Sequence, residues 1–243
     1  MPFSWLLRER FWRQLHFYLG LLLSLQLLAW FASGVVMSWF PIEQVRGEHL
    51  QLPAPEVRWS DATITPAAAL QQAPIEFRQA QLSLSQRGAE PVYQLQHHDQ
   101  QLFISALSGQ VLTPLSEHEV QKLALQRYHS TGAVRSANLL AQTPNEVRGL
   151  DAPLWQVNFA DDEQTAFYFH PITGQLQRVR TDTWRLYDFF WMLHIMDYDD
   201  RSDFNHPLLI ISAGSALGFT LGGFVLLGFR FARGPRRHNN IPG

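Results

Sequence analysis

Histidine is the residue type whose placement in this sequence best suits chemistry. Four histidines lie at or near the ends of two long apolar runs, where an ionisable residue is by default a candidate functional group. His16 opens the first run, His49 follows its end by about nine residues, His194 lies in an aromatic stretch, and His206 directly precedes the second run. Two neutral imidazoles can occupy both axial positions of a haem iron, and haem b needs no cysteine for attachment. These four residues are therefore the candidate cofactor-binding residues, with haem b as the cofactor.

Distance restricts how the four histidines can combine. A helix of about 20 residues is about 30 Å long, so His16 cannot share one iron with His194 or His206. A site built from two histidines of one chain must then use His49, His194 and His206, whereas His16 would pair with a second copy of the chain or with a partner subunit. The alternative for His16 is an interfacial side chain that reaches the lipid headgroups.

Composition argues against several other kinds of chemistry. The chain has no cysteine, which excludes disulfides, iron–sulfur clusters and a thiol nucleophile. The net charge of -2 argues against a nucleic-acid partner. No nucleotide-binding glycine motif, nucleophile elbow or HExxH signature is present. The acidic segment 197–203 fails the calcium-loop template, because Arg201 occupies its fifth position and no glycine its sixth, so we expect a water-facing acidic loop.

The two apolar runs predict two transmembrane helices. The first covers residues 15–40 and the second residues 207–231, and each exceeds the roughly 20 residues that a helix needs to cross a bilayer. We expect the first run to be retained as an anchor, because it is longer than the apolar core of a signal peptide. In the second run Gly214, Gly218 and Gly222 share one helical face, which favours close helix packing, with space for a cofactor as the alternative.

Charge predicts the orientation of these helices. The residues before the first run carry a net charge of +2, and the residues from Arg230 onward carry +4. Between Pro41 and His206 there are 12 basic and 20 acidic residues, which leaves -8. Positively charged ends face the cytoplasm, so we expect residues 1–14 and 232–243 to be cytoplasmic and residues 41–206 to be periplasmic in a Gram-negative cell.

The region between the runs contains two similar patterns, at about residues 60–113 and 114–182. In each, a capped helix start (Thr65-Pro66, and the capping box Ser116–Glu119) precedes alternating strands and a Gly-Gln turn. Each pattern predicts a helix followed by a small antiparallel meander, and residues 183–206 predict an amphipathic segment at the membrane surface. The predicted fold class is therefore α+β, with two transmembrane helices flanking a periplasmic domain of two repeats. The helix after Ser116 carries apolar residues at Val120, Leu123, Leu125 and Tyr128, whereas Asp161-Asp162-Glu163 and His97-His98-Asp99 lie in predicted hairpin tips.

Three short motifs carry a family resemblance. The segment FHPITGQL at residues 169–176 resembles the end of a PepSY domain. The opening LHFYLGL at residues 15–21, and Leu186-Tyr187-Asp188 followed by Leu193-His194, are similar to motifs of the PepSY-associated transmembrane protein family. Larger members of that family have four or more transmembrane helices, and Phe17 stands where they usually have arginine.

The resemblance implies a function. The family includes iron-regulated inner-membrane proteins and ferrisiderophore reductases, in which membrane histidines carry haem. The resemblance therefore implies an inner-membrane protein that takes part in transmembrane electron transfer linked to iron reduction. It also implies that the protein works as a homo-oligomer or together with a partner membrane subunit. The alternative is a non-enzymatic, membrane-anchored binding, inhibitory or assembly subunit whose partner is a periplasmic protein or a ferric chelate.

Overall fold

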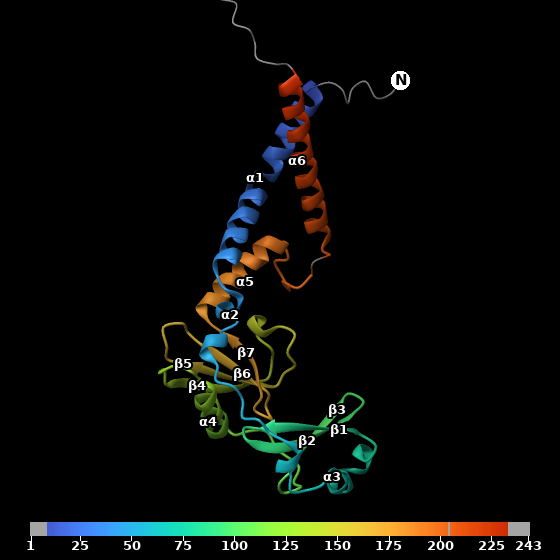
Figure 1. Ribbon diagram of the computed structural model, residues 1–243, viewed down its shortest axis with the longest axis vertical. Coiled ribbons are helices and arrows are strands. Elements are labelled where there is room, and N and C mark those ends of the chain that lie inside the picture. Colours follow the sequence, from blue (N-terminus) through green and yellow to red (C-terminus); the bar gives the residue numbers. More distant parts are fainter. Residues whose placement is uncertain (1–8, 204, 233–243) are drawn as a thin grey trace, which may run out of the picture. The chain divides into compact units, whose positions relative to one another are not determined.

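The computed structural model describes residues 9–203 and 205–232, and these form two compact units. The helical unit combines the chain up to Trp39 with the chain from Asp188 onward, and the α/β unit covers Phe40–Tyr187. Residues 188–203, which the sequence predicts to be an amphipathic segment at the membrane surface, are grouped in the same compact unit as the long helices. Figure 1 shows the order of the elements along the chain.

The helical unit contains the two helices that the apolar runs predict. Helix α1 covers Glu9–Trp39 and helix α6 covers Pro207–Ala232, and both are long and apolar enough to cross a membrane. Helix α1 begins before the predicted start at residue 15, and an ion pair between Glu9 and Arg13 joins its first two turns. Many large apolar side chains on both helices face outward, such as Leu25, whose exposed fraction is 80%. An outward apolar surface of this kind suits a lipid environment rather than water.

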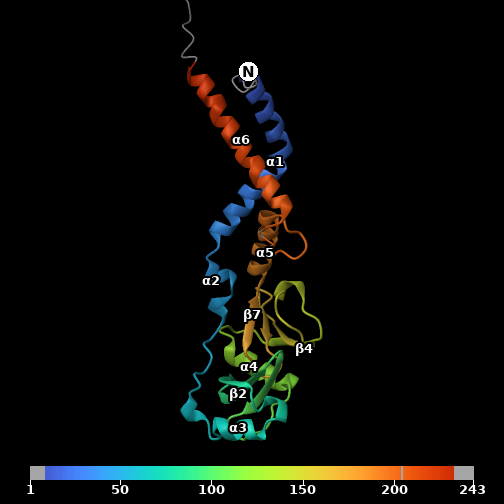
Figure 2. The same ribbon diagram turned by 90° about the vertical axis from the view of Figure 1, so that its right-hand side faces the viewer.

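Helices α1 and α6 pack against each other and cross within the helical unit (Figure 2). The crossing uses glycine, and only one end of the glycine face that the spacing predicted takes part in it. A Cβ atom at Gly20 would lie 2.8 Å from the ring of Phe219, so the two helices need glycine there. Of the predicted glycines only Gly222 approaches α1, near Trp12 and His16, whereas Gly214 and Gly218 have no described side chain within 4 Å. Close packing is therefore confined to the half of the helix pair that contains His16.

Helix α5 (Asp182–Ile195) begins in the α/β unit and belongs to the helical unit from Asp188 onward. Its last turn lies beside the second half of α1, where Trp30 Nε1 donates a hydrogen bond of 2.8 Å to the carbonyl oxygen of His194. This contact joins the end of α5 to α1 within the helical unit.

The α/β unit contains two antiparallel sheets, each preceded by a helix. Strands β1, β2 and β3 follow helix α3 in the order β1-β2-β3, and strands β4 to β7 follow helix α4 in the order β4-β5-β6-β7. The helix-then-meander pattern is thus confirmed as fold, and with it an α+β architecture. The element bounds are α2 Ile42–Val45, α3 Pro66–Gln72, β1 Gln81–Arg87, β2 Glu90–His97, β3 Gln100–Ser105, α4 Glu117–Arg127, β4 Val134–Leu140, β5 Leu154–Phe159, β6 Ala166–Phe169 and β7 Leu176–Arg180, with short 3-10 turns at Glu48–Leu50, Trp59–Asp61, Ile75–Phe77 and Asn145–Val147.

Local signals set the starts of the two helices that precede the sheets. Thr65 caps α3 by accepting a hydrogen bond from the backbone of Ala68, and Pro66 occupies the first turn. Ser116 and Glu119 form the predicted reciprocal capping box at α4.

The second sheet carries the larger core. Helix α4 covers one sheet face, where aromatic side chains of β5 and β6 pack around Val120, Ala124 and Tyr128. Leu125, expected among the apolar positions of this helix, is 53% exposed because the helix turns Ala124 inward instead. The tip at Asp161 is also less solvated than predicted, since its carboxylate accepts hydrogen bonds from the Tyr128 hydroxyl at 2.6 Å and the Thr165 backbone at 2.8 Å.

Candidate functional site

His16 has a fixed ring orientation in the helical unit. Its Nδ1 lies 2.9 Å from the carbonyl oxygen of Phe219 on α6, and its ring stacks on that of Phe219. Because a carbonyl oxygen only accepts hydrogen bonds, Nδ1 carries the proton, and Nε2 of the neutral ring keeps its lone pair. Nε2 has no hydrogen-bond partner among the described residues. This is the tautomer in which metal-ligating histidines are commonly held.

Two glycines leave the space that the contact between His16 and Phe219 needs. A Cβ atom at Gly223 would lie 3.2 Å from Cε1 of His16, and one at Gly20 would meet the Phe219 ring. Both glycines therefore let the imidazole lie flat against α6 and reach its backbone.

An open groove lies beside His16, with a volume of about 450 Å³. Apolar side chains of α6 line it together with Arg230, which supplies a positive charge at the end of the helix. The volume falls within the roughly 300–1,000 Å³ of typical cofactor and ligand pockets. An imidazole lone pair, an apolar wall and an arginine for a carboxylate match the chemistry of haem b.

His194 is held in the same tautomer by a different partner. Its Nδ1 lies 2.9 Å from Oγ of Ser33, and the Ser33 hydroxyl donates its own hydrogen bond to the carbonyl oxygen of Trp30. With the Ser33 hydroxyl proton directed at Trp30, Nδ1 of His194 is the donor to Ser33 and Nε2 keeps its lone pair. Ser33 is completely buried, which distinguishes it from the exposed Ser24 and Ser38 on the same helix.

Hydrogen bonds and an ion pair to acidic residues stabilise the segment after His194. The carboxylate of Asp197 accepts backbone hydrogen bonds from Asp199, Ser202 and Asp203, which hold the pKa of Asp197 at about 2. Arg201 forms an ion pair with the buried Asp188 on α5. The predicted water-facing acidic loop is therefore internally bonded at Asp197, and the charge of Asp188 is neutralised.

The other two candidate histidines, His206 and His49, make hydrogen bonds that leave no lone pair of Nε2 available. The backbone N–H of Leu208 donates to Nδ1 of His206 at 3.3 Å, so the neutral His206 ring carries its proton on Nε2. His49 belongs to the α/β unit, where its Nε2 lies 3.4 Å from the carboxylate of Glu163. Both rings would have to give up these hydrogen bonds before Nε2 could bind a metal.

The two histidines with a free Nε2 lie at different levels of α1. His16 belongs to the helix itself, and His194 contacts it at Ser33, which is 17 residues further along. At 1.5 Å per residue these levels are about 25 Å apart along the helix axis. At this separation along α1, His16 and His194 of one chain cannot bind the same metal ion. In the described residues no three His, Asp or Glu side chains gather into a metal cluster, and the histidines at the β2–β3 turn form only a ring contact with each other.

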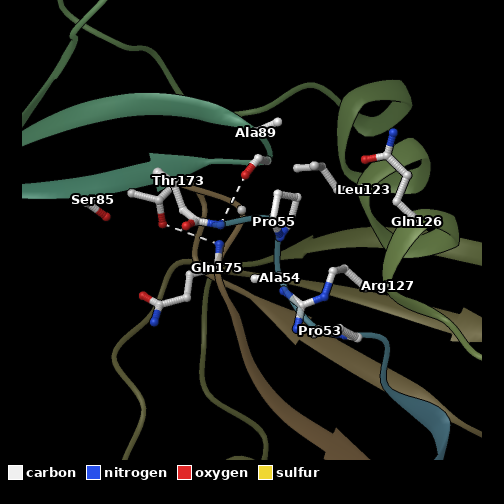
Figure 3. A pocket seen from close by; sticks show the side chains of 13 residues that line it. Pro53, Ala54, Pro55, Ser85, Ala89, Leu123, Gln126, Arg127, Thr173 and Gln175 are labelled. Carbon is white, nitrogen blue, oxygen red and sulfur yellow. Dashed lines mark hydrogen bonds between the residues drawn. The ribbon is translucent and has the colours of Figure 1, made fainter. Parts of the chain in front are cut away.

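A second candidate site is a pocket of about 520 Å³ within the α/β unit (Figure 3). The proline-rich segment 53–55, strand β1, helix α4 and the turn around Gly174 line it, so both sheets contribute. Leu123 lies between two glycine turns, since a Cβ atom would come within 2.9 Å of it at Gly88 and 2.5 Å at Gly174. The Thr-Gly of the PepSY-like motif is thereby part of the contact between the two halves of the unit.

Arg127 supplies the charge of this pocket. Its Nε donates a hydrogen bond of 2.8 Å to the carbonyl oxygen of Leu52, and burial lowers the pKa of the guanidinium, which stays charged at neutral pH. In the described part of the chain no carboxylate lies within ion-pair distance of it. Gln126, Gln175 and Ser85 add polar groups, so the pocket suits an anionic or amide-bearing ligand.

Comparisons of the chain with protein-family models, with curated proteins and with solved structures found no match. The PepSY assignment stays a prediction that its motif residues carry.

Sequence reasoning did not identify Ser33, Phe219 or Gly223. A serine inside an apolar run was a signal for Ser33, but Ser24 and Ser38 share it. Phe219 acts through its backbone carbonyl, which no side-chain pattern reveals.

Proposed function

We propose that this chain is a membrane-embedded electron-transfer subunit that binds haem b through His16 and His194. The observation that carries the proposal is that Nδ1 of each ring lies 2.9 Å from a protein oxygen, while Nε2 of each ring has no hydrogen-bond partner among the described residues. The outward apolar side chains of α1 and α6 support insertion into a bilayer. Bound haem would supply one-electron chemistry.

The residues around each histidine have distinct tasks. Phe219 and Ser33 orient the two imidazoles, and Arg230 beside His16 would offer a cation to a propionate. With the orientation predicted from the arginines, His16 serves the cytoplasmic face and His194 the periplasmic face of an inner membrane.

His16 and His194 would each hold one haem, and a second copy of the chain or a partner membrane subunit would supply a further histidine at each site. Because the chain has no nucleotide-binding motif, it receives electrons from a partner. The family resemblance adds iron reduction as the process served.

The test is a reduced-minus-oxidised visible spectrum of the full chain, produced with haem supplied and purified in detergent. We expect a b-type spectrum that His16→Ala and His194→Ala each reduce by about half and that the double variant abolishes. His206→Ala and His49→Ala are matched controls and should leave the spectrum unchanged. No spectrum from folded protein, or loss of it only in the control variants, would reject the assignment.

A second candidate function rests on the pocket around Arg127. A pocket of this size with an unneutralised arginine favours a non-enzymatic binding subunit whose two helices act as an anchor. The full chain would then capture a periplasmic protein or a ferric chelate, and Arg127→Gln or Ser85→Phe would abolish capture while His16→Ala would not. Equal capture of the partner by all three variants would exclude this pocket as its binding site.

A further inference from the structure

A groove in the α/β unit concentrates arginine in a region that is otherwise acidic. Its volume is about 670 Å³, and Arg46, Arg178 and Arg180 line it with Glu48 as the acidic residue. These are three of only 12 basic residues in a segment with a net charge of -8. The groove itself carries a net charge of +2, so its field is opposite in sign to that of the surrounding segment.

Two of the arginines are held in place before any ligand binds. Nη1 of Arg180 donates a hydrogen bond of 2.8 Å to the carbonyl oxygen of Val179, and its guanidinium carbon lies 4.0 Å from the centre of the Trp184 ring. Nη1 of Arg178 donates a bond of 2.7 Å to the carbonyl oxygen of Gln177. An arranged guanidinium loses less conformational entropy on binding, and its fork geometry matches the oxygens of a phosphate.

Protection of a sheet edge explains only part of this arrangement. Strand β7 is an edge strand, and charged side chains commonly guard such edges against pairing with another chain. Arg46, however, comes from the turn after α2 and not from the sheet, and Trp184 comes from the first turn of α5. The groove thus gathers three separate segments around one positively charged space.

Connectivity limits how far Arg46 can lie from the end of α1. Arg46 follows Trp39, the last residue of α1, by seven residues, which span at most about 25 Å. Trp184 lies on the helix that continues into the helical unit. A guanidinium pairs with phosphate oxygens through charge-assisted hydrogen bonds, and tryptophan is enriched at both membrane–water interfaces.

We infer that this groove binds the phosphate of an anionic phospholipid headgroup. The guanidinium groups of Arg46 and Arg178 contact the phosphate oxygens, while Arg180 on the Trp184 ring forms the floor. The inference rests on the membrane insertion proposed above, and it is independent of haem.

The test uses native mass spectrometry of the full chain in detergent, titrated with phosphatidylglycerol or phosphatidylcholine. We expect the wild type to retain phosphatidylglycerol preferentially, and Arg46→Gln/Arg178→Gln to weaken that binding by about tenfold or more. Both side chains are exposed, so the double variant should keep its fold. The matched control is Arg58→Gln/Arg78→Gln, which removes the same charge from exposed positions of the same unit and should bind lipid like the wild type.

Three results would overturn the inference. They are equal retention of both lipids, equal loss in the control variant, and tighter binding of inorganic phosphate or of a short glutamate-rich peptide than of phosphatidylglycerol. Tighter binding of phosphate would assign the groove to a soluble phosphate ester, and tighter binding of the peptide would assign it to an acidic strand on β7. The visible spectrum separates this inference from the haem proposal, because Arg46→Gln/Arg178→Gln should not change it and His16→Ala should not change lipid preference.

Discussion

The imidazole of His16 stacks on the ring of Phe219 with the centroids 4.1 Å apart and the planes 9° from parallel, while its Nδ1 bonds to the carbonyl oxygen of the same residue. One residue of α6 thereby fixes both the plane and the tautomer of a histidine that is 203 positions away in the sequence. Two contacts on one ring leave it little rotational freedom, and Nε2 is the atom that remains available.

Crowding at Gly223 should therefore disturb the His16 site. Gly223→Val places branched carbons where even a Cβ atom would lie 3.2 Å from the imidazole, so the ring must leave Phe219. We expect about half of the b-type absorbance to be lost. Gly218→Val is the matched control, because no described side chain lies within 4 Å of that position on the same helix. A full spectrum from Gly223→Val would show that this ring orientation is not needed for haem binding.

Removal of the Ser33 hydroxyl should weaken the His194 site without deleting the ligand. Ser33→Ala takes away the acceptor of the Nδ1–H bond, and loss of such a supporting bond typically costs 10–100-fold in affinity. We expect the fraction of haem that dissociates from the His194 site to rise accordingly. The haem that stays bound should show a shifted midpoint potential. Ser24→Ala is the control, since Ser24 makes the same hydrogen bond to its own helix but none to histidine. Equal behaviour of the two variants would contradict a positioning role for Ser33.

The Tyr128–Asp161 hydrogen bond should make stability depend on alkaline pH. Burial, followed by the bond to Asp161, raises the pKa of Tyr128 to about 12, whereas the unfolded chain titrates near 10. A raised pKa means that the stabilisation is complete below pH 10 and is lost as pH rises toward 12. We expect Tyr128→Phe to cost about 1–2 kcal/mol at pH 7, measured by urea unfolding, and the difference from the wild type to shrink above pH 10. A difference that stays constant up to pH 11.5 would argue against this linkage.

Glycine at position 174 should matter for two separable reasons. Its φ of +64° favours glycine, and a Cβ atom there would lie 2.5 Å from Leu123. We expect Gly174→Ala to lower the free energy of unfolding by about 2–4 kcal/mol, because backbone strain and overpacking add. Gly149→Ala isolates the strain alone, since φ is +83° there with no described atom within 4 Å, and should cost about 1–2 kcal/mol. Equal costs would mean that the contact with Leu123 is easily relieved.

Local signals made much of the architecture predictable. Uninterrupted apolar length predicts α1 and α6, the capping residues at Thr65 and Ser116 predict the starts of two helices, and alternating strands before Gly-Gln turns predict the meanders. Each of these signals depends on residues that lie close together in the sequence, so it can be recognised without knowledge of tertiary contacts. Strands β1, β4 and β7, the inward turn of Ala124 and the part played by Gly223 in helix packing were not predicted, because they depend on which surfaces meet.

The sequence by itself determined that histidines stand at the ends of apolar helices in a cysteine-free chain. Only the tertiary structure decided which of them keep a free Nε2, because the tautomer depends on the partner of Nδ1. For His16 that partner is the backbone of Phe219, and for His194 it is a serine 161 positions away. A backbone carbonyl leaves no trace in the pattern of side chains, and contacts over such separations form only when the helices pack.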